Sequence, residues 1–176
     1  MEQQGIPGIA PDSLATGFGY TYINASFAYT RPRGNRFNTE KWGAWYCGFD
    51  FETTKQEVIF HLTRALQAAS ESFDNETRCV ELIADFEADF IDLRDITPQP
   101  DCLDPDVSIG YPRGQQLATA VRESGHNGIV YPSVRHDGGT CLVAFWPGLV
   151  RNFIPGDTWI FKWAGSPEPS ISKGTT

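Results

Sequence analysis

The sequence has no apolar run approaching the roughly 18 residues of a membrane span, and its first residues do not join basic side chains to an apolar segment. Cysteine is scarce: the four residues Cys47, Cys79, Cys102 and Cys141 include no C-x-x-C pair, which argues against a zinc or redox centre. We therefore expect a cytoplasmic protein with reduced thiols, no metal site and no membrane partner.

Basic residues are also in the minority, since 14 Lys and Arg against 22 Asp and Glu give a net charge of −8. This balance argues against nucleic acid as a direct partner, because phosphate binding needs clustered Lys and Arg. Arg31, Arg33 and Arg36 do lie close together, so an anionic small molecule has a local positive site. Arg31 and Arg33 are more typical of solvated charges. The P-loop, G-x-G-x-x-G and H-E-x-x-H motifs are absent, which excludes the common nucleotide-loop and zinc-protease classes.

The 176 residues fit one domain with a single core. Residues 1–19 are rich in Gly and Pro and predict a loosely ordered segment, and residues 165–176 predict a disordered tail. Helical periodicity predicts helices at 54–69 and 115–124, the second ending at Gly125. Aromatic, β-branched and short apolar runs predict strands at 20–29, 42–49, 79–86, 89–93, 128–131, 141–145 and 159–163, with a polar loop at 97–106. Several strands interrupted by few helices indicate an α+β fold with a mixed, largely antiparallel sheet.

Arg36 and Tyr46 are the first candidate site residues. The Arg36 guanidinium suits phosphate, and Gly34 beside it lets the backbone approach a ligand closely, although a surface arginine in a loop explains the same pattern. Tyr46 can stack on a flat ring while its hydroxyl holds a hydrogen bond. An aromatic side chain packed in the core is the simpler explanation for Tyr46 taken alone.

Glu57 and Ser133 are the second pair of candidates. Thr54 and Glu57 match the S/T-x-x-E capping box, which assigns Glu57 a structural role worth about a kcal/mol. A carboxylate facing a cleft can instead hold a ribose hydroxyl or stabilise a positive charge that develops on a sugar carbon, and His61 lies on the same side of the helix. Ser133 follows the strand at 128–131 without a G-x-S-x-G elbow, which favours a hydrogen-bonding role over a nucleophilic one.

Four sequence blocks in fixed order resemble the RES domain, a family named for its Arg, Glu and Ser. They are GNRFN at 34–38, WGAWYC at 42–47, FETTKQEVIFH at 51–61 and GHNGIVYPSVRHDGGTCLVAF at 125–145. The resemblance covers about residues 27–164, after a short N-terminal segment at 1–26. It places the family's arginine, tyrosine, glutamate and serine at Arg36, Tyr46, Glu57 and Ser133.

The resemblance implies a fold similar to ADP-ribosyltransferases and NAD as a substrate rather than a cofactor. It also implies a toxin that cleaves the nicotinamide–ribose bond as a glycohydrolase or phosphorylase, with Glu57, Arg36 and Ser133 catalytic and Arg36, Tyr46 and Ser133 binding NAD. An Xre-type antitoxin or another immunity protein would hold the toxin inactive, and a homodimer is compatible with this assignment. Two alternatives stay open: an ADP-ribosyltransferase that modifies a protein, and an inactive binding module that keeps the fold.

Overall fold

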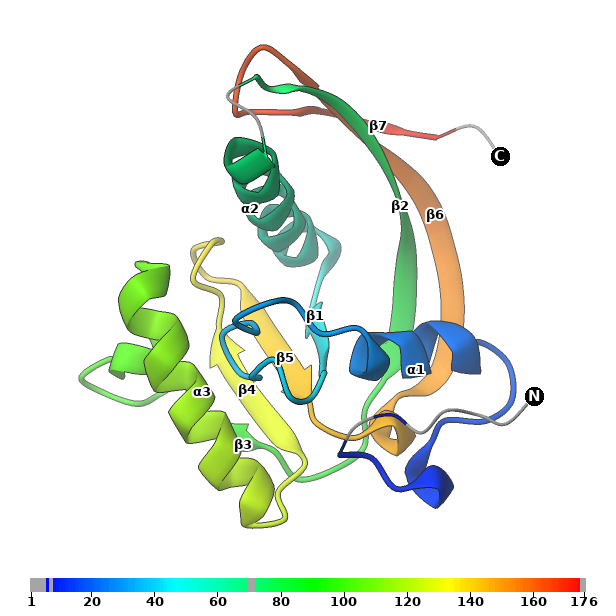
Figure 1. Ribbon diagram of the computed structural model, residues 1–176, viewed down its shortest axis with the longest axis vertical. Coiled ribbons are helices and arrows are strands. Elements are labelled where there is room, and N and C mark those ends of the chain that lie inside the picture. The colour runs from blue at the N-terminus through cyan, green and yellow to red at the C-terminus, as the bar shows by residue number, and fades with distance from the viewer. Residues whose placement is uncertain (1–5, 7, 70–71, 175–176) are drawn as a thin grey trace.

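Two β-sheets with helices packed around and between them form an α+β structure, in agreement with the predicted fold class (Figure 1). The computed structural model describes residue 6 and the ranges 8–69 and 72–174. Among these residues, no helix is both long and apolar enough to cross a membrane.

The first sheet has four strands in the order β1-β5-β4-β3: β1 (Trp45–Gly48), β5 (Thr140–Ala144), β4 (Gly128–Pro132) and β3 (Ile91–Asp92). Its pairs are antiparallel except β3 and β4, which run parallel. Side chains of β4 and β5 are buried on both faces, because Ile129 and Val143 contribute to one apolar cluster and Val130 and Leu142 to another. Burial on both faces explains why these strands read as continuous apolar runs in the sequence.

Each face of this sheet is covered by a different part of the chain. Helix α3 (Val107–Glu123) packs on one face through Ala118 and Val121. Helix α1 (Tyr20–Ala28) and the N-terminal segment cover the other, where Ile23 and Phe27 are buried together with Ile9. The described part of residues 1–19 thus contributes to the core, in contrast to the loosely ordered segment that was predicted.

The strand predicted at residues 20–29 is wrong, because this segment is α1. Its two buried side chains, Ile23 and Phe27, are four residues apart and share one helical face, whereas Tyr20, Tyr22 and Tyr29 are exposed. Gly19 precedes the helix at φ 79°, and a Cβ there would lie 2.1 Å from Phe153. The aromatic content that favoured a strand therefore lies mostly on the surface.

The second sheet is a long curved ribbon of three antiparallel strands, in the order β2-β6-β7 (Figure 1). Strand β2 (Asp74–Asp85) pairs along most of its length with β6 (Arg151–Ala164), and β7 (Ser170–Lys173) pairs with residues 159–162 of β6. The tail predicted to be disordered thus contains a strand, whose order comes from pairing with the β6 backbone rather than from its own composition.

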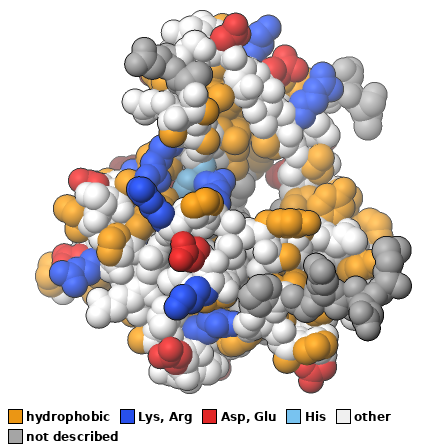
Figure 2. Space-filling model, viewed as in Figure 1, with side chains coloured by type: hydrophobic (Ala, Val, Ile, Leu, Met, Phe, Trp, Pro, Cys, Tyr) orange, Lys and Arg blue, Asp and Glu red, His pale blue; other side chains and the backbone are white. Residues whose placement is uncertain are grey.

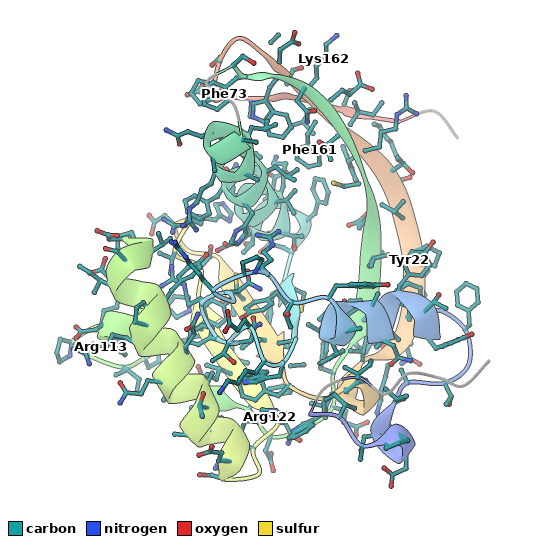
Figure 3. All side chains as sticks on the ribbon, in the orientation of Figure 1. Tyr22, Phe73, Arg113, Arg122, Phe161 and Lys162 are labelled. Carbon is teal, nitrogen blue, oxygen red and sulfur yellow. The ribbon has the colours of Figure 1, made fainter. Side chains whose placement is uncertain are left out.

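Helix α2 (Phe51–Ala69) lies between the two sheets (Figure 1). Phe161 of β6 is buried and extends into the space between the ribbon and α2 (Figure 3). The neighbouring Trp163 is fully buried, and its indole nitrogen donates a 3.0 Å hydrogen bond to the Thr63 hydroxyl on α2. The second sheet is therefore attached to the helix that carries Glu57.

Candidate active site

The site begins where β1 leads directly into α2. Asp50 caps this helix: one carboxylate oxygen accepts from the Thr53 amide at 2.7 Å and the other from the Thr53 hydroxyl at 2.8 Å. These hydrogen bonds lower the pKa of Asp50. The capping box predicted for Thr54 and Glu57 is wrong, because the helix begins at Phe51 and Glu57 lies in its second turn. Glu57 therefore does not serve as the helix cap.

Glu57 is paired with Ser133 across the site. The Ser133 hydroxyl, just after the end of β4, donates to Glu57 Oε1 at 2.9 Å, and the Cys141 thiol lies 3.8 Å from the same oxygen. Both contacts end on Oε1, and among the described residues no hydrogen bond to Oε2 is found. The second oxygen thus keeps its lone pairs for a ligand in the cavity that Glu57 lines.

A hydrogen-bonded turn holds the Ser133 hydroxyl in place. Its oxygen accepts from the backbone amides of Arg135 and His136, at 3.1 and 3.0 Å, so its own proton is directed at Glu57. The His136 ring lies 2.9 Å from the hydroxyl of Thr53, which is fully buried at the start of α2. The turn that carries the serine and the helix that carries the glutamate are therefore tied together.

Arg36 lies in the same cavity but is largely committed to the protein. It is only 7% exposed, and its Nη1 donates to the carbonyl oxygens of Cys102 at 2.7 Å and Asp104 at 2.9 Å. Helix α3 accommodates it with two glycines: a Cβ at Gly110 would lie 2.5 Å from Arg36 Nη1, and one at Gly114 would lie 2.2 Å from its carbonyl oxygen. Within the part of the chain that the structure describes, Nε and Nη2 of Arg36 make no hydrogen bond and are available to a ligand.

Tyr46 lines the cavity, yet its hydroxyl serves the turn around Arg36. The hydroxyl accepts from the Phe37 amide and donates to Asn38 Oδ1, both at 2.9 Å. Burial raises the pKa of Tyr46 above its ordinary value, so the phenol stays neutral. Gly34, expected to admit a ligand, instead allows a tight turn: its φ is 68°, and a Cβ would lie 2.1 Å from the Asn38 carbonyl oxygen. The hydroxyl of Tyr46 is thus occupied by the protein, whereas its ring is available to stack on a ligand.

The four family positions thus meet at one cavity of about 200 Å³, since Arg36, Tyr46 and Glu57 line it and Ser133 holds Glu57. A larger cavity of about 360 Å³ also borders Tyr46 and Cys47, but its walls are mainly apolar. The charged and hydrogen-bonding groups gather in the smaller cavity, which is therefore the candidate site.

Several residues that surround this cavity were not predicted from the motifs. Arg135 lies in the same block as Ser133, and its guanidinium is 3.5 Å from the centre of the Phe60 ring. Arg31, expected to be a solvated charge, lines the cavity, with its Nη1 3.4 Å from His61 Nδ1. Tyr111 of α3 lines it too, with Arg64 5.7 Å from its ring centre. A sequence signal exists for Arg64, because positions 57, 61 and 64 share one face of a helix.

His61 is neutral in this setting. Burial and the nearby arginines, Arg31 first among them, lower the pKa of His61 to about 4. A guanidinium only donates hydrogen bonds, so His61 Nδ1 accepts from Arg31 and the ring proton lies on Nε2. Figure 2 shows Lys and Arg side chains beside a histidine where the surface is hollowed near α2. Among the described residues, no group of three or more His, Cys, Asp or Glu side chains is placed to hold a metal ion.

The RES domain family model matches residues 13–164 of this chain. The chain belongs to the RES domain family. The match begins before the boundary at residue 27 suggested by the motifs, and it includes α1, which packs on the first sheet of this RES domain. None of the curated proteins matches the chain. RES domains are associated with enzymatic toxins that act on NAD. The cavity at Glu57 is the candidate site for such an activity.

Proposed function

We propose that this RES domain is an NAD-consuming toxin that breaks the bond between nicotinamide and ribose. The observation that carries the proposal is the Glu57–Ser133 pair, in a cavity lined by Arg31, Arg36 and Arg135. One oxygen of the carboxylate is fixed by the serine, and the other has no hydrogen-bond donor among the described residues. An anionic substrate with a cationic reacting group matches this combination of charges.

The chemistry needs little from the protein at the leaving group. Nicotinamide in NAD carries a positive charge, so when its bond to the ribose carbon breaks it takes the bonding electrons and departs neutral without a general acid. The charge passes to the ribose, which becomes an oxocarbenium-like cation. Glu57 would stabilise this cation, and one preorganised group of this kind supplies roughly 10² to 10³ in rate. The acceptor then adds to the same carbon.

The other residues would bind and orient the substrate. Ser133 would set the direction of the Glu57 carboxylate and contact the ribose or the nicotinamide amide. Tyr46 would stack its ring on nicotinamide, and Arg36, through the nitrogens not bound to the 102–104 backbone, would contact the ribose or the adjoining phosphate. These proposed roles thus distinguish the parts of each side chain that would contact the substrate from the parts that bind the protein and fix the side chain in place.

The association of RES domains with toxin–antitoxin systems supports a proposal about regulation. We propose that a cognate antitoxin of the Xre type, or another immunity protein, holds the enzyme inactive in the cytoplasm. A homodimer remains compatible with this arrangement. Transfer to a protein is the alternative outcome, because it uses the same donor site and differs only in the acceptor.

The test is to incubate the purified protein with NAD, with and without inorganic phosphate, and to measure nicotinamide release beside a Glu57→Gln variant. Wild type should release nicotinamide, and Glu57→Gln should be at least about 100-fold slower. Because Glu57 does not cap α2, the variant should keep the melting temperature of the wild type. Equal rates for the two proteins would remove Glu57 from the mechanism. NAD labelled on its ADP-ribose part distinguishes the acceptors: water gives ADP-ribose, phosphate gives a phosphorylated product, and transfer labels a protein band.

A further inference from the structure

A second cavity of about 430 Å³ adjoins the first, and both are bordered by Arg31, Asn35, His61 and Tyr111. The first cavity, of about 200 Å³, is smaller than the roughly 300 to 1,000 Å³ typical of sites that enclose a whole ligand. A dinucleotide that places its nicotinamide ribose beside Glu57 must therefore continue beyond this cavity, and the shared residues mark where it can do so.

The second cavity has the charge that the rest of such a substrate requires. Its lining includes Arg31, Arg33 and Arg64, and none of the described residues that border it is Asp or Glu. Together the two linings contain five arginines and one acid, Glu57, in a chain of net charge −8. Such a local excess of positive charge is unusual against this background, and it suits phosphate groups.

The arginines of the second cavity are also more available than Arg36. Arg31, Arg33 and Arg64 are exposed, whereas Arg36 is 7% exposed and has its Nη1 bound to two backbone carbonyls. Arg64 lies against the Tyr111 ring, 5.7 Å from its centre. Among the described residues no hydrogen bond uses the Arg64 guanidinium, so its donors are available to a ligand. The rings of Pro32, Tyr111 and Pro112 line the same cavity and offer apolar surface to a flat base.

We infer that this second cavity is the subsite for the ADP part of the dinucleotide, and that Arg31 and Arg64 bind its phosphates. The inference rests on the proposed function, which places the nicotinamide ribose beside Glu57 and thereby sets the direction of the substrate. It assigns the phosphate contacts of the ADP part to exposed arginines of the second cavity, and leaves Arg36 in the first cavity to the ribose or the phosphate that adjoins it. These contacts are remote from the bond that breaks, so they are made equally in the ground state and the transition state and affect KM rather than kcat.

The kinetic test compares NAD with nicotinamide mononucleotide, which has the same reacting bond and lacks the AMP part. Arg64→Ala and Arg31→Ala should each raise the KM for NAD about tenfold, the size of one charge-assisted hydrogen bond, with kcat nearly unchanged. Arg64→Ala should raise the KM for the mononucleotide less than the KM for NAD, because the mononucleotide lacks the AMP phosphate. Arg113→Ala is the matched control, because this exposed arginine of α3 lines neither cavity and lies on the side of the helix away from α2 (Figure 3).

Direct binding tests the subsite without turnover. Calorimetric titration of ADP into the Glu57→Gln protein should show binding that the additional Arg31→Ala and Arg64→Ala changes weaken about 100-fold together, and that Arg113→Ala leaves intact. ADP affinity unaffected by the double change, or equal losses for NAD and the mononucleotide in Arg64→Ala, would overturn the subsite. If the wild type releases no nicotinamide from either substrate, the proposed function fails, and the ADP titration still decides whether the cavity binds phosphate.

Discussion

His61 is a neutral histidine among cations, and this environment gives the protein a defined pH response. Its pKa in the folded protein is about 4, against about 6.5 in an unfolded chain. Between these values the unfolded state binds more protons than the folded state, so this contribution to stability is present above pH 6.5 and is lost as the pH falls toward 4. Arg31, Arg135, Arg64 and Arg36 all disfavour the charged ring.

We expect wild type to lose more thermal stability between pH 7 and pH 5 than His61→Gln, which keeps a polar side chain but cannot bind the proton. Melting temperatures of both proteins at the two pH values provide the measurement. All other residues are the same in the two proteins, so their contributions cancel in the difference. Parallel pH profiles would show that His61 does not have the lowered pKa.

At the scale of elements, α3 shows how packing can reverse a helix propensity. Replacing a helical glycine by alanine normally stabilises a helix by about 1 kcal/mol. At Gly114, however, the new Cβ would lie 2.2 Å from the Arg36 carbonyl oxygen, and a backbone atom cannot move away without displacing the turn that holds Arg36. Overpacking of this kind costs about 1 to 3 kcal/mol, so it outweighs the propensity gain.

Gly114→Ala should therefore lower the free energy of unfolding, measured by urea denaturation, and also slow nicotinamide release because Arg36 is displaced. The control is Gln116→Ala on the same helix, which is exposed and should leave both quantities unchanged. An increase in stability for Gly114→Ala would mean that the Arg36 turn adapts at no cost.

Elements whose order comes from their own periodicity or burial could be predicted from the sequence. The apolar runs at 128–131 and 141–145 are strands because both sheet faces are buried. The periodic segment at 54–69 lies within α2, and the segment at 115–124 covers only the second half of α3, which begins at Val107 and ends at Glu123. Elements that depend on distant partners could not be predicted. The polar strand β7 exists through its pairing with β6, and α1 buries two side chains on a sheet distant in sequence.

The site shows the same division between local and distant information. The order of four motifs indicated Arg36, Tyr46, Glu57 and Ser133, and these residues meet around one cavity. Their supporting contacts were not predictable, because they join residues far apart in the chain. Arg36, for example, binds the carbonyl oxygens of residues 102 and 104. The cap at Asp50 was missed although it is local, because S/T-x-x-E at Thr54 matched a second and equally plausible start of the helix.

At the scale of the whole molecule, the distribution of charge opposes the net charge. The chain carries −8, yet the two adjoining cavities are lined by five arginines. A concave positive region can attract a small anion locally even when the net charge of the protein is negative. The negative composition and an anionic substrate are therefore compatible, and the fold reconciles them by bringing α2, α3 and the 31–36 turn to one place.

The two sheets are joined through α2, and Trp163 is one of the side chains that make this connection. It is fully buried on β6, lies beside Phe161, and donates to Thr63, whose hydroxyl also donates to the Pro167 carbonyl before β7. Truncating a buried tryptophan to alanine costs about 3 to 5 kcal/mol. Because the lost contacts lie on the helix that carries Glu57, we expect Trp163→Ala to destabilise the whole domain.

Urea unfolding of Trp163→Ala, followed by circular dichroism and by tryptophan fluorescence, tests this expectation. A single transition shifted to lower urea in both signals indicates that the ribbon and the first sheet unfold together. Trp163→Phe keeps most of the apolar surface and loses the hydrogen bond, so beyond the effect of the lost surface it should lower the free energy of unfolding by only about 1 kcal/mol. Ile154→Ala, on an exposed part of β6, should lower it little. Two separate transitions, or a loss below about 1 kcal/mol for Trp163→Ala, would mean that the second sheet is not coupled to the site through α2.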